Sequence, residues 1–250
     1  GLNFELKGAP VSVRATQEVI LCAGAVGSPN ILELSGIGQE QRLRDLGLPV
    51  VLDLPGVGEN LQDHLQIRCV YKVKNTVTLN QRANSLFGRI GMGLEYFLFR
   101  RGPLTMAPSQ LGAFAKSDPS YDTPNLEFHV QPLSLDKFGD PLHEFPAFTA
   151  SVCNLRPESR GSIHLKSPDY REKPSIRPNY LSHERDRQVA ADAIRLTRKI
   201  AAAKALQAFA PEEYLPGPVV EGDEALARAA GEIGTTIFHP VGTCRMGQDA

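Results

Sequence analysis

The chain has 250 residues, of which 42% are hydrophobic and 22% charged, a composition that is typical of a folded globular protein and excludes the disordered and fibrous classes. Its 27 basic and 28 acidic residues give a net charge of −1, which leaves no overall excess of positive charge for the phosphates of a nucleic acid or for an anionic membrane surface. No apolar run approaches the roughly 18 residues that a membrane-spanning helix needs, so we expect neither a nucleic-acid partner nor a membrane span.

The four cysteines stand far apart in the sequence and are Cys22, Cys69, Cys153 and Cys244. They form no Cys-x-x-Cys pair and no cysteine and histidine spacing that suits zinc, so we predict no metal site. They are typical of buried thiols in a reducing compartment, which indicates a cytoplasmic protein. The chain opens at Gly1 without an initiating methionine and soon enters a β-rich stretch, which suggests a fragment of a longer protein.

The first predicted elements are a strand and a helix joined by a tight turn. An alternating run at 11–15 is followed by a continuous apolar run at 18–23, which indicates a strand buried on both faces, as in a parallel sheet. Beyond Gly24, Ser28 and Pro29 predict a helix with the serine at the N-cap and the proline at the first helical position. The free N–H groups at such a helix start can face an anion, although a plain helix cap explains the same residues.

A second short strand is predicted at 49–54, and it leads into a loop with the sequence PGVGENLQDH at 55–64. Two glycines of this loop follow a strand, but the third glycine of a dinucleotide-binding fingerprint is missing and no helix pattern comes next. We interpret the segment as a structural loop, in which Asn60 and His64 are secondary candidates for a site.

From residue 66 the pattern changes to short strands separated by proline and glycine, which is typical of an antiparallel sheet. The predicted strands are 66–74, 110–116, 125–131, 147–154 and 162–166. Within this region, an amphipathic segment is predicted near 87–101.

Two helices follow the predicted sheet, at 182–206 and 221–234. The first carries apolar residues at steps of three and four that we expect to be buried, namely Val189, Ala193, Leu196, Ile200 and Ala203. A last short strand at 235–238 leads to His239.

His239 stands in a constrained setting. It precedes Pro240, and a residue before proline is pushed into an extended conformation. Gly242 leaves room for a bulky group to approach the backbone. These facts alone are equally compatible with a structural and a catalytic histidine.

Two of these segments resemble signatures of the glucose-methanol-choline (GMC) family of flavin-dependent oxidoreductases. The segment GAVGSPNILELSGIG at 24–38 closely resembles the second signature of the family, and HPVGTCRMG at 239–247 looks like its active-site histidine segment. The loop PGVGENLQDH and the segment RPESRG at 156–161 look like further family landmarks in the expected order. The resemblance therefore covers nearly the whole chain.

The resemblance implies an α+β fold, with an antiparallel-sheet substrate domain that helices cover and with pieces of an FAD-binding α/β domain. The expected boundaries are 1–64 for the C-terminal part of the FAD-binding domain, 65–236 for the substrate-binding domain, and 237–250 for a return segment that carries the active-site histidine. Family members also have an initial GxGxxG unit and a second catalytic histidine or asparagine, and this sequence contains neither. We therefore expect an internal and C-terminal fragment that is inactive by itself.

The implied activity is oxidation of a primary alcohol to an aldehyde, in which a flavin accepts the hydride that no amino-acid side chain can accept. His239 is the implied base for the hydroxyl proton, because imidazole titrates close to neutral pH. The implied cofactor is FAD, and the residues expected beside it are Ala23, Gly24, Ala25, Ser28, Asn60 and His64. The resemblance leaves the electron acceptor of the reduced flavin open among oxygen, a quinone and a dye.

Two residues are candidates for contact with the substrate. In choline-specific relatives a carboxylate in the substrate cavity neutralises the trimethylammonium group, and Gln110 aligns with it. An uncharged side chain argues against a tight quaternary-ammonium site, because an unpaired cation in a dry pocket is unfavourable. His129 is the second candidate, although a single histidine in a strand more often has a structural role.

Two other functions fit the same sequence. A few family members are hydroxynitrile lyases, which use the same histidine for proton transfer while the flavin undergoes no redox change. Alternatively, the chain is a folded binding or structural fragment without catalysis.

Overall fold

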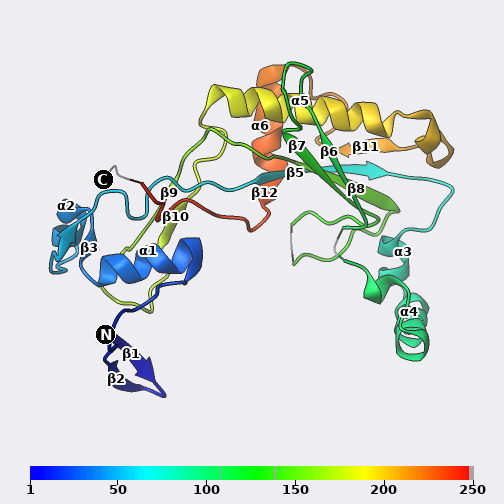
Figure 1. Cartoon of the computed structure of the whole chain (residues 1–250). Coiled ribbons are helices and arrows are strands. Elements are labelled where there is room, and N and C mark those ends of the chain that lie inside the picture. The colour runs from blue at the N-terminus through cyan, green and yellow to red at the C-terminus, as the bar shows by residue number, and fades with distance from the viewer. Residues whose placement is uncertain (108, 138, 248–250) are drawn as a thin grey trace. The chain divides into compact units, whose positions relative to one another are not determined.

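The computed structural model describes residues 1–107, 109–137 and 139–247, and the chain divides into two compact units (Figure 1). Unit 1 consists of Gly1–Leu61, Gly161–Arg177 and Pro240–Ala250, and unit 2 consists of Gln62–Arg160 and Pro178–His239. Two of these boundaries lie within three residues of the domain limits predicted at 64 and 236. The middle segment of unit 1 lies inside the range predicted for the substrate-binding domain.

Unit 2 contains a six-stranded sheet in which all neighbouring strands are antiparallel. The strands follow the order β11-β5-β8-β7-β6, and β12 also pairs with β5. Their bounds are β5 Leu65–Lys72, β6 Leu111–Ala115, β7 Leu126–Gln131, β8 Ala147–Asn154, β11 Glu212–Leu215 and β12 Gly234–Thr236. The predicted combination of helices with an antiparallel sheet is confirmed.

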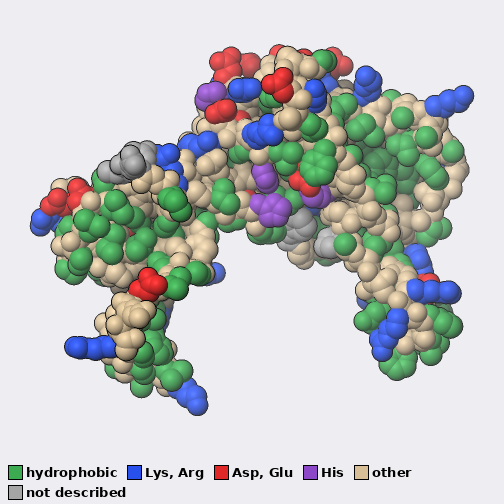
Figure 2. Space-filling view, viewed as in Figure 1, with side chains coloured by type: hydrophobic (Ala, Val, Ile, Leu, Met, Phe, Trp, Pro, Cys, Tyr) green, Lys and Arg blue, Asp and Glu red, His purple; other side chains and the backbone are tan. Residues whose placement is uncertain are grey.

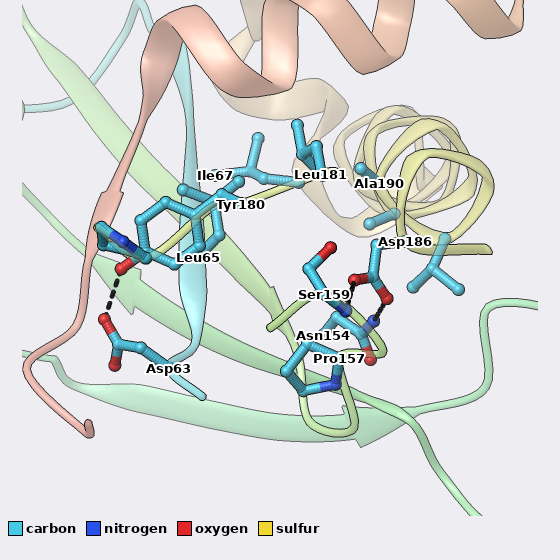
Figure 3. Close-up of a pocket in the computed structure, with 13 residues that line it drawn as sticks. Asp63, Leu65, Ile67, Asn154, Pro157, Ser159, Tyr180, Leu181, Asp186 and Ala190 are labelled. Carbon is cyan, nitrogen blue, oxygen red and sulfur yellow. Dashed lines mark hydrogen bonds between the residues drawn. The ribbon is translucent and has the colours of Figure 1, made fainter. Parts of the chain in front are cut away.

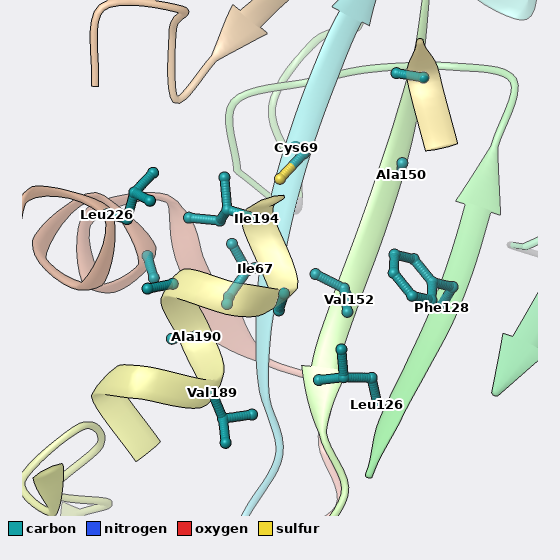
Figure 4. Packing of buried hydrophobic residues seen from close by; sticks show 14 of the residues in the cluster. Ile67, Cys69, Leu126, Phe128, Ala150, Val152, Val189, Ala190, Ile194 and Leu226 are labelled. Carbon is teal, nitrogen blue, oxygen red and sulfur yellow. The ribbon is translucent and has the colours of Figure 1, made fainter. Parts of the chain in front are cut away.

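Two helices of unit 2, α5 (Glu184–Ala201) and α6 (Asp223–Ile233), cover one face of this sheet (Figures 1 and 4). The helices and 3₁₀ turns of unit 2 are α3 Leu79–Asn84, α4 Leu86–Phe99, Pro103–Thr105, α5 Glu184–Ala201, Lys204–Phe209 and α6 Asp223–Ile233. Successive residues of a strand point to opposite faces, so every second residue of β5, β7 and β8 faces α5 and α6. The resulting core includes Ile67, Cys69, Leu126, Phe128, Val152, Val189, Ile194 and Leu226.

The buried stripe of α5 differs from the predicted one. Val189 and Ala193 are buried as expected, but Ile200 is 41% exposed. Because the helix turns by about 100° per residue, the buried face is rotated toward Ala190, Ile194 and Thr197, which are also buried. Apolar spacing alone does not fix this rotation when alanines occupy several neighbouring positions.

Unit 1 is built from short elements. A hairpin formed by β1 (Leu2–Leu6) and β2 (Ala9–Val13) precedes α1 (Gly24–Leu34). The remaining elements are β3 Ile37–Gly38 with its parallel partner β4 Leu52–Asp53, α2 Glu40–Asp45, and the antiparallel pair β9 Ser162–His164 and β10 Ser175–Arg177. The predicted strand at 162–166 therefore belongs to this small pair and not to the large sheet.

Two predictions for the start of unit 1 are wrong. Residues 18–23 form no strand, and Ile20 is 76% exposed. A strand needs hydrogen-bonding neighbours, and none of the strands in the described residues runs beside this segment. Helix α1 begins at Gly24 and not at Ser28, with Ala23 at the N-cap, so Pro29 lies inside the helix.

The cysteines are free but are not all buried. Cys69 and Cys153 lie in the interior, where burial raises the pKa of each thiol to about 12. Cys22 and Cys244 are exposed, contrary to the prediction. The cytoplasmic location, which depended on these thiols, stays a prediction. Among the residues that the structure describes, no helix combines the length and apolar character needed to cross a membrane.

Candidate active site

A tight turn of unit 2 presents His239. Strand β12 pairs with the start of β5, and the chain then turns at Phe238, whose φ of 65° is left-handed and uncommon for a residue other than glycine. The N–H of Phe238 donates to Oγ1 of Thr236 at 2.9 Å, and the N–H of Ile237 donates to the carbonyl of His64 at 3.3 Å. His239 follows immediately and is exposed.

The carboxylate of Asp63 fixes this turn. Its Oδ1 accepts a hydrogen bond from the backbone N–H of His239 at 3.0 Å, and its Oδ2 accepts one from the hydroxyl of Thr236 at 2.5 Å. The hydroxyl of Tyr180 also donates to Oδ2 (Figure 3). Burial and the hydrogen bond to Asp63 raise the pKa of Tyr180, so its hydroxyl stays a donor. Asp63 therefore positions the backbone of His239.

His64 flanks the ring of His239. The two ring centroids lie 5.8 Å apart at an interplanar angle of 81°, an edge-to-face arrangement. Nδ1 of His64 is 2.9 Å from the carbonyl oxygen of Asn154, and because a carbonyl only accepts, Nδ1 carries a proton. Adjacent residues of one loop, Asp63 and His64, thus contact the backbone and the side chain of His239.

A small cavity behind this network is too small for a substrate (Figure 3). It measures about 30 Å³, close to the space that one water molecule needs. Its far side contains Asp186, whose carboxylate accepts the backbone N–H groups of Glu158 and Ser159 at 2.7 to 3.1 Å. The landmark RPESRG is therefore bound to the first turn of α5, and its role within unit 2 is structural.

The sheet face opposite α5 and α6 is polar. Strand register places His129 of β7 opposite Ser151 of β8, and Glu127 opposite Cys153. Nε2 of His129 lies 3.5 Å from Oε1 of Glu127. Among the residues that the structure describes, His129 Nε2, Ser151 Oγ and Gln131 Oε1 are buried atoms without a hydrogen bond. Buried polar groups are normally bonded, so this face is suited to contact a polar ligand.

Gln110 belongs to the same face. Its N–H donates to the carbonyl of Val130 at 3.0 Å, and Gly112 pairs with His129, so the alternation of the strand directs Gln110 and His129 to one side of the sheet. The Gln110 side chain contacts Met106. A pocket of about 470 Å³ extends from here toward Arg82.

Glu127, His129 and Cys153 also have the donor types of a metal site, with their donor atoms within 4.8 Å of one another. Burial raises the pKa of Cys153 to about 12, which favours the neutral thiol over the thiolate that binds metals. This cluster is therefore a weaker candidate for a metal than for a polar substrate contact.

In unit 1, three landmark segments are joined around the start of α1. Pro29 has no N–H, so the carbonyl of Ala25 lacks its helical donor, and the hydroxyl of Thr243 bonds to that carbonyl at 2.6 Å. The N–H of Gly58 donates to the carbonyl of Thr243 at 2.9 Å, and Nδ2 of Asn60 donates to that of Gly242 at 3.1 Å. Segments 24–38, 55–64 and 239–247 therefore meet.

A pocket of about 450 Å³ opens within unit 1. Its walls come from the loop at 54–60 and from the segment at 244–247, with Leu32 of α1. Of the predicted site residues, unit 1 contains Ala23, Gly24, Ala25, Ser28 and Asn60, and unit 2 contains His64, Gln110, His129 and His239.

The sequence interpretation missed three residues that hold the His239 turn in unit 2, namely Asp63, Tyr180 and Thr236. In unit 1 it missed Thr243, which bonds to the start of α1. Asp63 and Thr243 lie inside the landmark segments, which was a usable signal. Tyr180 and Thr236 stand in no motif and are identified only by their contacts.

Comparison with known proteins assigns the chain to one family. Models of the GMC oxidoreductase family match residues 1–66 and residues 157–250. The chain belongs to the GMC oxidoreductase family.

Several relatives are similar over nearly the whole chain. The oxygen-dependent choline dehydrogenase of Chromohalobacter salexigens is 40% identical over 248 residues, which are 99% of this chain and 44% of the relative. That of Pseudomonas aeruginosa is 39% identical over 96% of this chain and 43% of the relative. The chain thus spans less than half the length of these relatives.

Among solved structures, pyridoxine 4-oxidase from Mesorbium loti has a TM-score of 0.79 at 27% identity. The match covers 97% of the present chain and 43% of the oxidase. A formate oxidase from Aspergillus oryzae, studied for modification of its FAD, has a TM-score of 0.85 at 25% identity, with 95% and 46% coverage.

Proposed function

We propose that the full-length protein that contains this chain is an FAD-dependent oxidoreductase that oxidises a primary alcohol to an aldehyde, with His239 as the base. The observation that carries the proposal is the exposed His239, whose backbone is bound to Asp63 and whose ring is flanked by His64. Family membership and the FAD of the similar formate oxidase support it.

The residues present fit a flavin nucleotide. Helix α1 begins without a side-chain cap, and Gly24, with φ of 72°, has open space where a Cβ would lie. A backbone start of this kind suits the approach of a phosphate group. We assign the contacts with FAD to Ala23, Gly24, Ala25, Ser28, Asn60 and His64. When bound, FAD supplies the hydride acceptor.

Four residues of the chain have separate roles in proton transfer and in binding of the alcohol. The imidazole of His239 accepts the hydroxyl proton of the alcohol, the usual role of a histidine that acts as a general base. Asp63 positions His239 and does not touch the substrate. Gln110 and His129, on the polar face of the sheet, orient the alcohol by hydrogen bonds.

We infer that the alcohol is uncharged. The similar relatives are choline dehydrogenases, but the family resemblance aligns Gln110 with the carboxylate that choline-specific members carry. The pocket that Gln110 lines is also lined by Arg82, and its described lining residues include no carboxylate that could pair with a cation.

The test is anaerobic mixing of the full-length protein with an uncharged primary alcohol or with choline, followed by the flavin absorbance. We expect the flavin to bleach with the uncharged alcohol at higher kcat/KM than with choline. His239→Gln should slow bleaching by about 10²- to 10⁴-fold, the usual contribution of a general base.

His183→Asn is the matched control, because His183 is an exposed N-cap on α5 and asparagine also caps helices. It should bleach at the wild-type rate. A flavin that stays oxidised with every alcohol would favour a hydroxynitrile lyase or a fragment without catalysis. Equal rates for His239→Gln and the wild type would remove His239 from the role of base.

A further inference from the structure

Helix α4 directs a set of large apolar side chains away from the rest of unit 2. They are 51% to 85% exposed and belong to Leu86, Phe87, Ile90, Leu94, Phe97 and Leu98. At about 100° of rotation per residue, these positions fall within an arc of roughly 120° on one side of the helix. An amphipathic helix normally packs such an arc against a protein core. We call these six residues the α4 face.

The opposite side of α4 is already anchored. Met92 is buried, and a Cβ added at Gly88 would lie 2.1 Å from the carbonyl oxygen of Arg82, so the two helices α3 and α4 approach closely there. Glu95 lies 3.7 Å from Arg82 and 3.6 Å from Arg101. The helix therefore has a defined inner side, and the α4 face is its outer side.

Positive charge lies at the ends and along one flank of α4, beside the α4 face. Segment 82–101 contains four arginines and one glutamate, a net charge of +3 in a chain whose net charge is −1. The arginines are Arg82, Arg89, Arg100 and Arg101, of which Arg82 and Arg101 lie near Glu95, so Arg89 and Arg100 carry the positive charge available beside the α4 face. Figure 2 shows hydrophobic side chains over α4 with Lys and Arg side chains beside them. The near-neutral charge of the whole chain thus conceals a local excess of positive charge.

We propose that the α4 face binds the surface of an anionic lipid bilayer, with α4 lying in the plane of the interface. The six side chains are hydrocarbon only, which suits acyl chains, and the arginines suit the lipid phosphates. The 14 residues of α4 extend about 21 Å, less than the roughly 30 Å of a hydrocarbon core, so the helix lies on the bilayer and does not cross it.

A protein partner fits this surface less well. Protein interfaces carry about one hydrogen bond per 100–200 Å², interspersed with apolar contacts. The α4 face has no polar side chain within its arc. Its charges stand at the ends and flank of the helix, where lipid headgroups would lie.

The experiment is co-sedimentation of the full-length protein with vesicles of phosphatidylcholine and phosphatidylglycerol, or of phosphatidylcholine alone. We expect binding to the anionic vesicles that weakens as salt is raised. Phe97→Glu should reduce the bound-to-free ratio at least about tenfold, because it places a charge among acyl chains. Val219→Glu, at a loop residue that is 89% exposed and outside α4, should bind like the wild type.

A second variant tests the electrostatic part. Arg89→Gln combined with Arg100→Gln changes exposed side chains only, so it should fold, and each change should lower binding to anionic vesicles about fivefold. Absence of binding by the wild type, or equal binding by all variants, would overturn the proposal. So would a wild-type dimer that Phe97→Glu converts to a monomer, or a melting temperature that Phe97→Glu alone lowers, since another surface of protein would then cover the α4 face.

Discussion

His164 of unit 1 lies between two carboxylates. Its Nδ1 is 2.7 Å from Oε1 of Glu33, and its Nε2 is 2.8 Å from Oε1 of Glu59. Since an ionised carboxylate only accepts hydrogen bonds, a carboxylate at each ring nitrogen favours the doubly protonated, cationic ring. Desolvation of the buried ring acts to lower its pKa, as does the charge of Arg42, but the bonds to Glu33 and Glu59 outweigh both and raise the pKa of His164 above 6.5.

This raised pKa predicts a pH-dependent stability. A histidine whose pKa is higher in the folded state stabilises the fold fully below its unfolded-state pKa, and the contribution is lost as the pH rises through the folded-state pKa. We expect the urea midpoint of the wild-type chain to fall more between about pH 6 and about pH 9 than that of His164→Gln, which cannot carry the charge. Circular dichroism at a series of pH values measures both.

The control for this series is His183→Asn, which should follow the wild-type curve. If the midpoints of His164→Gln and the wild type changed in parallel with pH, the ion cluster would contribute nothing to the pH dependence.

At the scale of elements, α5 offers a matched pair of isoleucines. Ile194 is fully buried in the core against the sheet (Figure 4), and Ile200 on the same helix is 41% exposed. Ile194→Ala should lower the free energy of unfolding by about 2–5 kcal/mol through lost burial and a residual cavity. Ile200→Ala should change it by about 0.5 kcal/mol or less. Urea titrations of both variants decide the point, and equal losses would mean that α5 has a different buried face.

The strands show how much of the fold could be predicted from the sequence. Alternation predicted β8 to the residue and the other central strands to within two residues, because each has one apolar and one polar face. The strand at 18–23 failed, since a strand depends on neighbours that its own sequence does not contain. The motifs identified His239, but the partner that positions it, Asp63, is 176 residues away, and no local pattern encodes such a contact.

At the scale of the whole molecule, the chain spans 44% of the Chromohalobacter relative. We predict that the 250-residue chain by itself does not oxidise alcohols, because the implied nucleotide-binding unit and second catalytic residue are outside it. The measurement is reduction of an artificial electron acceptor in the presence of added FAD and a primary alcohol, with the full-length protein as the positive control. Turnover by the chain alone would show that these parts are dispensable.

The discontinuity of unit 1 has a consequence for biosynthesis. Its three segments are separated by the two segments of unit 2, and the last of them begins at Pro240, directly after His239. During translation residues 1–61 must therefore wait for their partners until the segments 161–177 and 240–250 have left the ribosome. Segments that wait in this way expose apolar surface and bind chaperones. Within this chain, the bond between His239 and Pro240 is thus the point at which synthesis passes from the last segment of unit 2 to the last segment of unit 1.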